Sequence, residues 1–410
     1  MRGALSFPFL RLYALALLFF SGNAILNVII PLKGESLGAS NTTIGLIMGA
    51  YLFTTMFFRP WAGSIIQRHG SIKVLRTILI INGFALILYT FTGLSGYLVA
   101  RMLQGVSTAF FSMALQISII DALPEKDRSQ GISLYSLFTY MPGIAGPLLA
   151  LGLWENGGIN AFAIVMVSIA VLTGVFGYGA KIARSPETPE SPMNPSVRQG
   201  SNMIQSLGEL VKNPFLLKCS VMMLSASLVF GAVTAFVPLY SEEVPGGSAG
   251  IYLMLQAGTV VLARFALRKK IPSDGKWHTT YMACTMLMLA VASQSVGLAD
   301  IGGVLFFYLG AVLMGAAQAI LYPSLMTYLS FVLPQLNRNV LMGIFIASAD
   351  LGVSLGGILM GPVADFFSYS FMYTICALLS SAMILVAIDQ REMWSRLSKK
   401  KIGVSKKERG

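Results

Sequence analysis

Long apolar runs, separated by short polar or Gly/Pro-containing breaks, fill most of this 410-residue chain. A helix needs about 20 mostly apolar residues to cross a bilayer, and each run meets that length. A period of two is absent, and the runs far exceed the roughly ten residues of a membrane β-strand. The pattern therefore predicts an all-α membrane protein with twelve spanning helices, near residues 9–30, 43–66, 74–92, 96–120, 131–153, 160–182, 214–240, 248–267, 278–298, 302–330, 340–364 and 367–388.

One long hydrophilic stretch divides these runs into six and six. It includes the sequence SPETPESPMNPS, whose Pro, Ser and Glu content cannot build a packed core. The expected organisation is an N-terminal six-helix bundle over residues 1–182 and a cytoplasmic linker over 183–213. A C-terminal six-helix bundle over 214–390 and a basic cytoplasmic tail over 391–410 complete the chain.

Charge is scarce, and its distribution predicts an orientation. Charged residues make up 11% of the chain, against about 25% in a soluble domain, which argues against a soluble enzyme. With the N-terminus inside, nearly all loop Lys and Arg residues fall on the cytoplasmic side, as the positive-inside rule requires. The other side holds one basic residue, Lys33, together with the acids Glu35, Glu155, Glu242, Glu243, Asp300 and Asp365. The pattern predicts a multi-pass protein of the cell membrane with both termini in the cytoplasm.

The excess positive charge of +12 thus reports topology rather than a ligand. Clustered Lys and Arg beside a span attract anionic lipid headgroups, so membrane lipids are the expected partner of the tail, and nucleic acid is not expected.

The two sets of runs repeat one another. Matching positions recur at similar offsets, as in the pairs Arg59 with Arg264, Gly70 with Gly275, Arg128 with Arg338, and Gly146 with Gly356. Duplicated halves with a site between them are typical of secondary transporters.

Three motifs then resemble those of the major facilitator superfamily. Residues 63–70 resemble the motif between helices 2 and 3, with Gln67 where that motif has an aspartate. Residues 101–105, Arg-Met-Leu-Gln-Gly, match the helix 4 motif, and residues 143–150 resemble the helix 5 motif of antiporters, without its final glycine pair. The resemblance covers nearly the whole chain and implies the twelve-helix, two-bundle fold of that family.

Within the superfamily, the chain resembles bacterial drug exporters. The run from Phe9 to Leu32 and the stretch from Gly231 to Tyr240 also resemble exporters of opine-type metallophores, the staphylopine-type group. This resemblance implies proton-driven export.

Two charged residues lie deep in predicted spans. Charge inside a membrane persists mainly where it faces a cavity or a partner, which makes Asp350 and Arg101 the leading site residues. Desolvation favours the protonated form of a carboxyl group and a nearby cation favours the ionised form. We therefore expect Asp350 to carry a proton or pair with substrate, and Arg101 to bind an anionic group or control proton release. For Asp350 a structural hydrogen bond is the alternative.

Uncharged polar groups complete the expected substrate site. They share helix faces in pairs or lie one turn from a charged residue, and they are Asn23, Asn27, Gln104, Tyr252, Gln256, Gln318 and Tyr322. Amides and phenols suit a polar ligand that must be released again. Such residues also hydrogen-bond helices together in membranes, and both interpretations stay open.

A third group is expected to act in gating. Its members are small, bend-forming or loop-end residues, namely Gly63, Arg68, Gly70, Gly143, Gly146, Pro147, Arg128 and Arg338. Static close packing is the alternative for the glycines, and topogenic charge is the alternative for Arg128 and Arg338.

The expected function is export of a small polar or zwitterionic metabolite, such as an opine-type metallophore, by proton antiport. No P-loop and no Cys or His cluster is present in the sequence, so ATP, a metal and other cofactors are not expected. Multidrug efflux by proton antiport and proton-coupled import of a small solute stay open. A membrane-embedded enzyme is disfavoured, because no nucleophile–base constellation lies within a span. The expected form is a monomer.

Overall fold

The computed structural model describes residues 5–123, 125–179, 213–267, 272, 274–334 and 338–388. Within these residues the regular elements are helices, joined by short turns. The first six long helices are α1 (Phe7–Ser36), α2 (Asn41–His69), α3 (Ser71–Phe91), α4 (Leu94–Ala122), α5 (Glu125–Gly152) and α6 (Gly158–Tyr178). The second six are α9 (Pro214–Glu243), α10 (Ala249–Leu267), α11 (Thr279–Gly297), α12 (Ala299–Val332), α13 (Arg338–Phe366) and α14 (Tyr369–Ala387). A π-helical turn over Leu153–Gly157 joins α5 to α6.

Eleven of these helices are long and apolar enough to cross a membrane. The remaining long helix, α11, is rich in Thr and Ser. Its hydroxyls at Thr285 and Ser293 donate to backbone carbonyls one turn earlier, which satisfies them inside an apolar bundle. Because α11 packs against α12 and α14, it completes the second set of six. The predicted all-α, twelve-helix fold in two bundles is confirmed.

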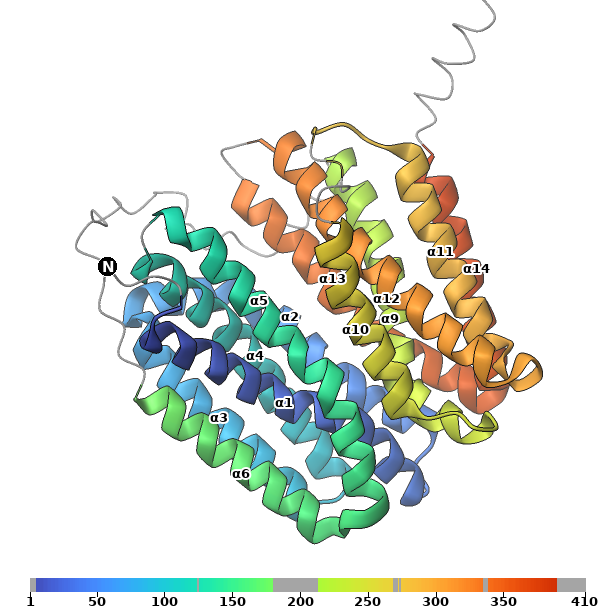
Figure 1. The fold of residues 1–410 in the computed structure, drawn as a ribbon, viewed down its shortest axis with the longest axis horizontal. Helices are drawn as coiled ribbons and strands as arrows, with labels where there is room; N and C mark the ends of the chain where they lie inside the picture. The colour runs from blue at the N-terminus through green and yellow to red at the C-terminus, as the bar shows by residue number, and fades with distance from the viewer. Residues whose placement is uncertain are drawn as a thin grey trace, which may run out of the picture.

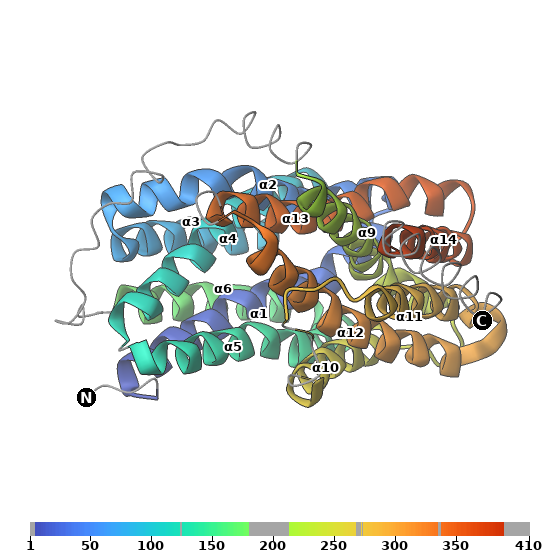
Figure 2. The same ribbon diagram turned by 90° about the horizontal axis from the view of Figure 1, so that it is seen from above.

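The helices gather in two halves, α1–α6 and α9–α14 (Figures 1 and 2). The predicted linker lies outside the described residues, apart from Asn213, and so does the predicted tail. Asn213 caps α9, because its Oδ1 accepts the backbone N–H groups of Phe215 and Leu216, each at 3.1 Å. Such a cap satisfies donors that the first helical turn leaves without a partner.

Two helix pairs make most of the contact between the halves, and we call them the α2–α13 seam and the α5–α10 seam. Glycines bring the backbones of the first seam together. A Cβ added to Gly361 would lie 2.6 Å from the carbonyl O of Asn41, and one added to Gly357 would lie 2.7 Å from that of Gly45. Only a residue without a side chain permits this approach. In Figure 1, α5 and α10 lie close at one end and diverge toward the other.

The end at which the halves meet carries the acids Glu35, Glu242, Glu243, Asp300 and Asp365, and we call it the acidic face. There Asp365, at the end of α13, accepts the N–H groups of Asn41 and Thr42 at 2.7 and 2.9 Å. These N–H groups begin α2, where a helix carries partial positive charge, so the carboxylate caps a helix of the opposite half. The Tyr369 hydroxyl also donates to the Asn41 Oδ1 at 2.7 Å.

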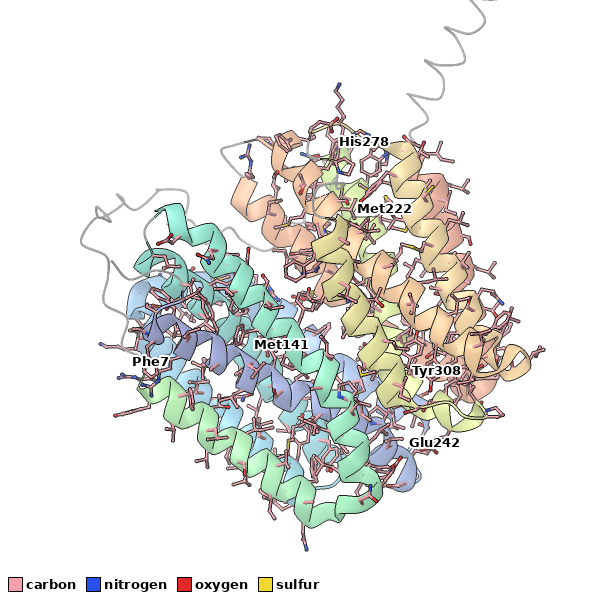
Figure 3. All side chains as sticks on the ribbon, in the orientation of Figure 1. Phe7, Met141, Met222, Glu242, His278 and Tyr308 are labelled. Atoms are coloured by element: carbon pink, nitrogen blue, oxygen red, sulfur yellow. The ribbon has the colours of Figure 1, made fainter. Side chains whose placement is uncertain are left out.

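The opposite end, which we call the basic face, carries Arg11, Arg68, Lys73 and Arg76. In the second half, Figure 3 labels Glu242 at the acidic face and His278 at the basic face. The halves are thus tied at the acidic face and separate toward the basic face.

Candidate functional site

Arg101, in α4, is 0% exposed and lies at the centre of a polar cluster in the first half. Its Nη1 donates to the Oδ1 of Asn23 at 2.6 Å and its Nη2 to the Oδ1 of Asn27 at 2.8 Å. The guanidinium also lies 5.3 Å from the centroid of the Tyr51 ring. The predicted shared face of Asn23 and Asn27 therefore exists, and both amides serve the same buried cation.

Gln104, one turn further along α4, extends this cluster. Its Oε1 accepts the hydroxyl of Tyr89 at 2.7 Å, and the Tyr89 phenol lies within electrostatic range of Arg101. The Nε of Arg101 is buried without a hydrogen-bond partner among the described residues. The cluster thus holds a positive charge through amide oxygens and an aromatic ring, with no carboxylate bound to it in the described part of the chain.

Asp350, in α13, pairs with Arg59 of α2. The Arg59 Nε and Nη2 lie 2.9 and 2.8 Å from the Asp350 Oδ2, so the ion pair crosses the α2–α13 seam. Both side chains are partly accessible, at 23% and 13%. Treating Arg101 as the only deep basic residue was therefore wrong. Because α2 continues to His69, Arg59 lies well inside the helix.

A second arginine occupies the other seam. Arg264 of α10 donates from Nη2 to the hydroxyl of Tyr140 of α5 at 2.8 Å, and its guanidinium lies 4.3 Å from the centroid of the same ring. The sequence contained a signal for Arg59 and Arg264, because each is a charge inside an apolar run. Tyr140 gave no such signal, since an aromatic residue in a span is ordinary.

The polar residues predicted in the second half separate into different environments. Gln256 donates to the Oε1 of Gln318 at 3.3 Å and links α10 to α12. Tyr322 lies within electrostatic range of Asp350, Arg59, Arg264 and Tyr140, which places it between the two seams.

Tyr252, by contrast, is fully buried against Phe307, with ring centroids 4.7 Å apart. It belongs to an aromatic cluster with Tyr240 and Tyr373. In this conformation its phenol lies in packed protein, away from the partly accessible arginines of the seams.

The residues expected to act in gating also differ in position. At the α5–α10 seam, a Cβ on Gly143 would lie 3.3 Å from the Ala257 Cβ, and the Pro147 carbonyl O would lie 3.3 Å from a Cβ on Gly250. Gly146 instead faces Ala24 of α1, inside its own half. Their roles in gating stay predictions.

The loop-end residues of this group lie toward the basic face. Gly63 packs near Met113, and Gly70 turns the chain between α2 and α3 with a φ of +82°. Arg68 is exposed. The Arg338 Nε is buried without a partner in the described chain, and the Arg128 side chain lies outside the described residues.

Two six-helix halves, tied at one face and carrying ionic side chains where they meet, define a secondary transporter of the alternating-access kind. The family model of the Major Facilitator Superfamily matches residues 12–294 and 274–408. The chain belongs to that family, which confirms the resemblance found in its motifs.

Curated relatives include an export protein and a multidrug resistance protein. The chain is 53% identical over 388 residues to the Staphylopine export protein of Staphylococcus aureus (strain Mu50 / ATCC 700699), covering 94% of this chain and 97% of that protein. It is 28% identical over 161 residues to Multidrug resistance protein 2 of Bacillus subtilis (strain 168), covering 38% and 40% of the two chains.

Solved structures share the fold. The nucleoside transporter NupG aligns with a TM-score of 0.69 at 15% identity, covering 93% of this chain and 98% of its own. The human organic anion transporter MFSD10 aligns with a TM-score of 0.64 at 15% identity, covering 92% and 98%. At identities this low, the similarity shows a shared fold and nothing further.

Proposed function

We propose that this protein exports staphylopine, or an opine-type metallophore close to it in chemistry, across the cell membrane in exchange for protons. The observation that carries this proposal is the similarity to the Staphylopine export protein, which extends over nearly the full length of both chains. The termini lie in the cytoplasm in this proposal, because the basic face then follows the positive-inside rule.

In that orientation the seams are closed toward the outside and the halves separate toward the cytoplasm. Asp350 is the proton-carrying residue. Its carboxylate is partly accessible and is held across the α2–α13 seam by Arg59. A proton on Asp350 removes the ionic part of this link, and loss of the proton to the cytoplasm restores it. The protonation state thereby changes the free-energy difference between the two arrangements of the halves.

Arg101 is the second coupling residue. A charge buried in the membrane costs free energy unless polar groups stabilise it, and the Asn23 and Asn27 oxygens do so here. Its fixed positive charge attracts an anionic substrate and controls proton release once the halves rearrange. Asn23, Asn27, Gln104, Gln256, Gln318 and Tyr322 supply polar contacts to that substrate.

The test is metallophore accumulation in a staphylopine-producing strain that lacks its exporter. Expressing this protein should lower intracellular staphylopine and raise the extracellular pool, whereas a higher intracellular pool would indicate import. Unchanged pools with increased drug resistance would redirect the function to multidrug efflux.

The role of Asp350 is tested in the same strain with Asp350→Asn. The variant should reach the membrane at the wild-type level and fail to restore proton-driven export. Asp300→Asn is the matched control, because Asp300 is exposed at the acidic face, where its Oδ1 accepts the N–H of the neighbouring Ile301 at 2.9 Å. Undiminished proton-coupled export by Asp350→Asn would refute the coupling role.

A further inference from the structure

The two seams are related by the internal repeat of the chain. Tyr140 and Asp350 are 210 positions apart, the same offset as Gly146 and Gly356. Arg59 and Arg264 are 205 positions apart, the same offset as Gly70 and Gly275, which share positive φ values of 82° and 71°.

The arginine links therefore occupy equivalent places in the two seams. In each seam an arginine, on α2 or α10, reaches a residue of the other half, on α13 or α5. The links differ in the chemistry of the acceptor. Arg59 meets a carboxylate, which balances its charge. Arg264 meets a phenol, which accepts a hydrogen bond and stacks on the guanidinium but carries no charge. Moreover, the Arg264 Nε is buried without a hydrogen-bond partner in the described part of the chain.

The surplus of positive charge extends across the region between the halves. Of the described residues deep in the helices there, three are arginines and one is an acid, namely Arg59, Arg101, Arg264 and Asp350. Tyr322 lies within electrostatic range of both seams, so the Arg264 and Asp350 charges share one region. A buried or partly buried charge is stable only with partners, and two of these positive charges have no carboxylate among the described residues.

We propose that Arg264, positioned by Tyr140, is a subsite for a carboxylate of the transported substrate, and that the region selects substrates with at least two carboxylates. A guanidinium donates two parallel hydrogen bonds to a carboxylate, which neither a phenol nor an amide reproduces. An opine is an amino acid alkylated on nitrogen by a keto acid, so it carries at least two carboxylates. The substrate identity rests on the proposed function, whereas the carboxylate subsite rests on the seams.

The proposal gives the substrate a definite effect on the protein. A substrate carboxylate at Arg264 would place in the α5–α10 seam the charge that Asp350 places in the α2–α13 seam. Only the substrate-loaded protein would then have a carboxylate at both Arg59 and Arg264.

The experiment measures chemical protection of Arg264 in the purified full-length protein. Phenylglyoxal modifies accessible arginines, and mass spectrometry of peptides gives the rate at each position. Iminodiacetate, a secondary amine with two carboxylates, is the probe, and its uncharged dimethyl ester is the paired control compound. Arg68, exposed at the end of α2, is the control position.

Iminodiacetate at about ten times its dissociation constant should slow modification of Arg264 by about tenfold, because only the unbound fraction of the protein reacts. Its ester should have no effect, and the Arg68 rate should not change. Equal rates at Arg264 with and without iminodiacetate would overturn the subsite. The same protection experiment is repeated with staphylopine in place of iminodiacetate. Protection by iminodiacetate without protection by staphylopine would leave the subsite standing and count against the proposed substrate.

A transport experiment distinguishes substrate binding by Arg264 from a purely structural role of this residue. Arg264→Gln should raise the staphylopine concentration for half-maximal export by about tenfold, and Arg264→Lys should restore part of the loss because it keeps the charge. An equal loss in both variants, with less protein in the membrane, would assign Arg264 a structural role and overturn the proposal.

Discussion

Gly361→Ala should open the acidic face, because the new methyl group has no room in the α2–α13 seam. Its Cβ would lie 2.6 Å from the Asn41 carbonyl O and 2.9 Å from the Thr42 Cα. Carbon–oxygen contacts of this kind normally begin at about 3.3 Å, so the two backbones must move apart by roughly 0.7 Å. Both atoms belong to the main chain of α2, so no side-chain rotation relieves the clash.

The free-energy cost falls on one conformation. Inserting a methyl group into a well-packed contact typically costs about 1–3 kcal/mol. The contact joins the two halves, so it exists only while the acidic face is closed. The closed arrangement should therefore lose about 5- to 150-fold in population relative to the open one. The change also raises helix propensity by about 0.5–1 kcal/mol in both arrangements, and a matched glycine variant corrects for it.

Labelling of a buried seam position measures this population. Ser354 is 0% exposed and its carbonyl O faces Gly49 across the seam. In a background with Cys219, Cys284 and Cys376 replaced by Ser, Ser354→Cys should react slowly with a membrane-impermeant maleimide added outside. Adding Gly361→Ala should raise the labelling rate by about 5- to 150-fold, in proportion to the change in population. The same change should reduce export.

Two other glycines provide the controls. Gly258→Ala meets no atom within 4 Å, so it should change neither labelling nor export. In Gly231→Ala the methyl would meet the backbone of Val353 within the second half, so it should lower the amount of folded protein without exposing Ser354. If Gly361→Ala behaves like Gly258→Ala, the seam is not the closed gate that the structure indicates.

Two further predictions concern polar contacts. Asp365→Ala removes the carboxylate that accepts the Asn41 and Thr42 N–H groups at the start of α2, a loss of typically about 0.5–2 kcal/mol for such a contact, while Ser40 still accepts the Thr43 N–H. The change should raise Ser354→Cys labelling in the same assay, and an unchanged rate would show that the glycine contacts alone keep the face closed. Asn27→Leu removes an acceptor from the buried Arg101, which costs about 1–3 kcal/mol, and should lower the melting temperature of the purified protein. Ser21→Ala is the control for Asn27→Leu, because the Ser21 hydroxyl donates a hydrogen bond within its own helix, to the Leu17 carbonyl O. Equal melting temperatures of the two variants would contradict the prediction for Asn27→Leu.

The fold could be predicted because its determinants are local. Apolar runs of spanning length define the helices, and the charges of the loops define alternate ends. Even α11, whose Thr and Ser residues weaken its apolar character, was placed as a span over 278–298 and forms a helix over Thr279–Gly297. Its hydroxyls bond the backbone one turn earlier, which costs the span little.

The site could be predicted only in part, because its contacts join distant helices. Helical periodicity placed Asn23 and Asn27 on one face, and both bind Arg101. The pairing of Arg59 with Asp350 spans 291 positions, and it depends on how two halves register against each other. No period within one helix contains that information. For the same reason Tyr252 was expected beside substrate, although its surroundings are aromatic.

The α2–α13 seam combines two kinds of contact with different responses. Near the acidic face, glycine backbones and the Asp365 cap form short-range contacts that are either made or lost. Deeper in the seam, the Arg59–Asp350 pair has a strength that depends on a proton. The α5–α10 seam has the equivalent arginine but a neutral acceptor, Tyr140. If a substrate carboxylate completes that second link, one seam responds to the proton and the other to the substrate. In the proposed exchange of substrate for protons, the protein must distinguish a loaded from an empty site before it changes conformation, and this asymmetry between repeated halves supplies a physical basis for doing so.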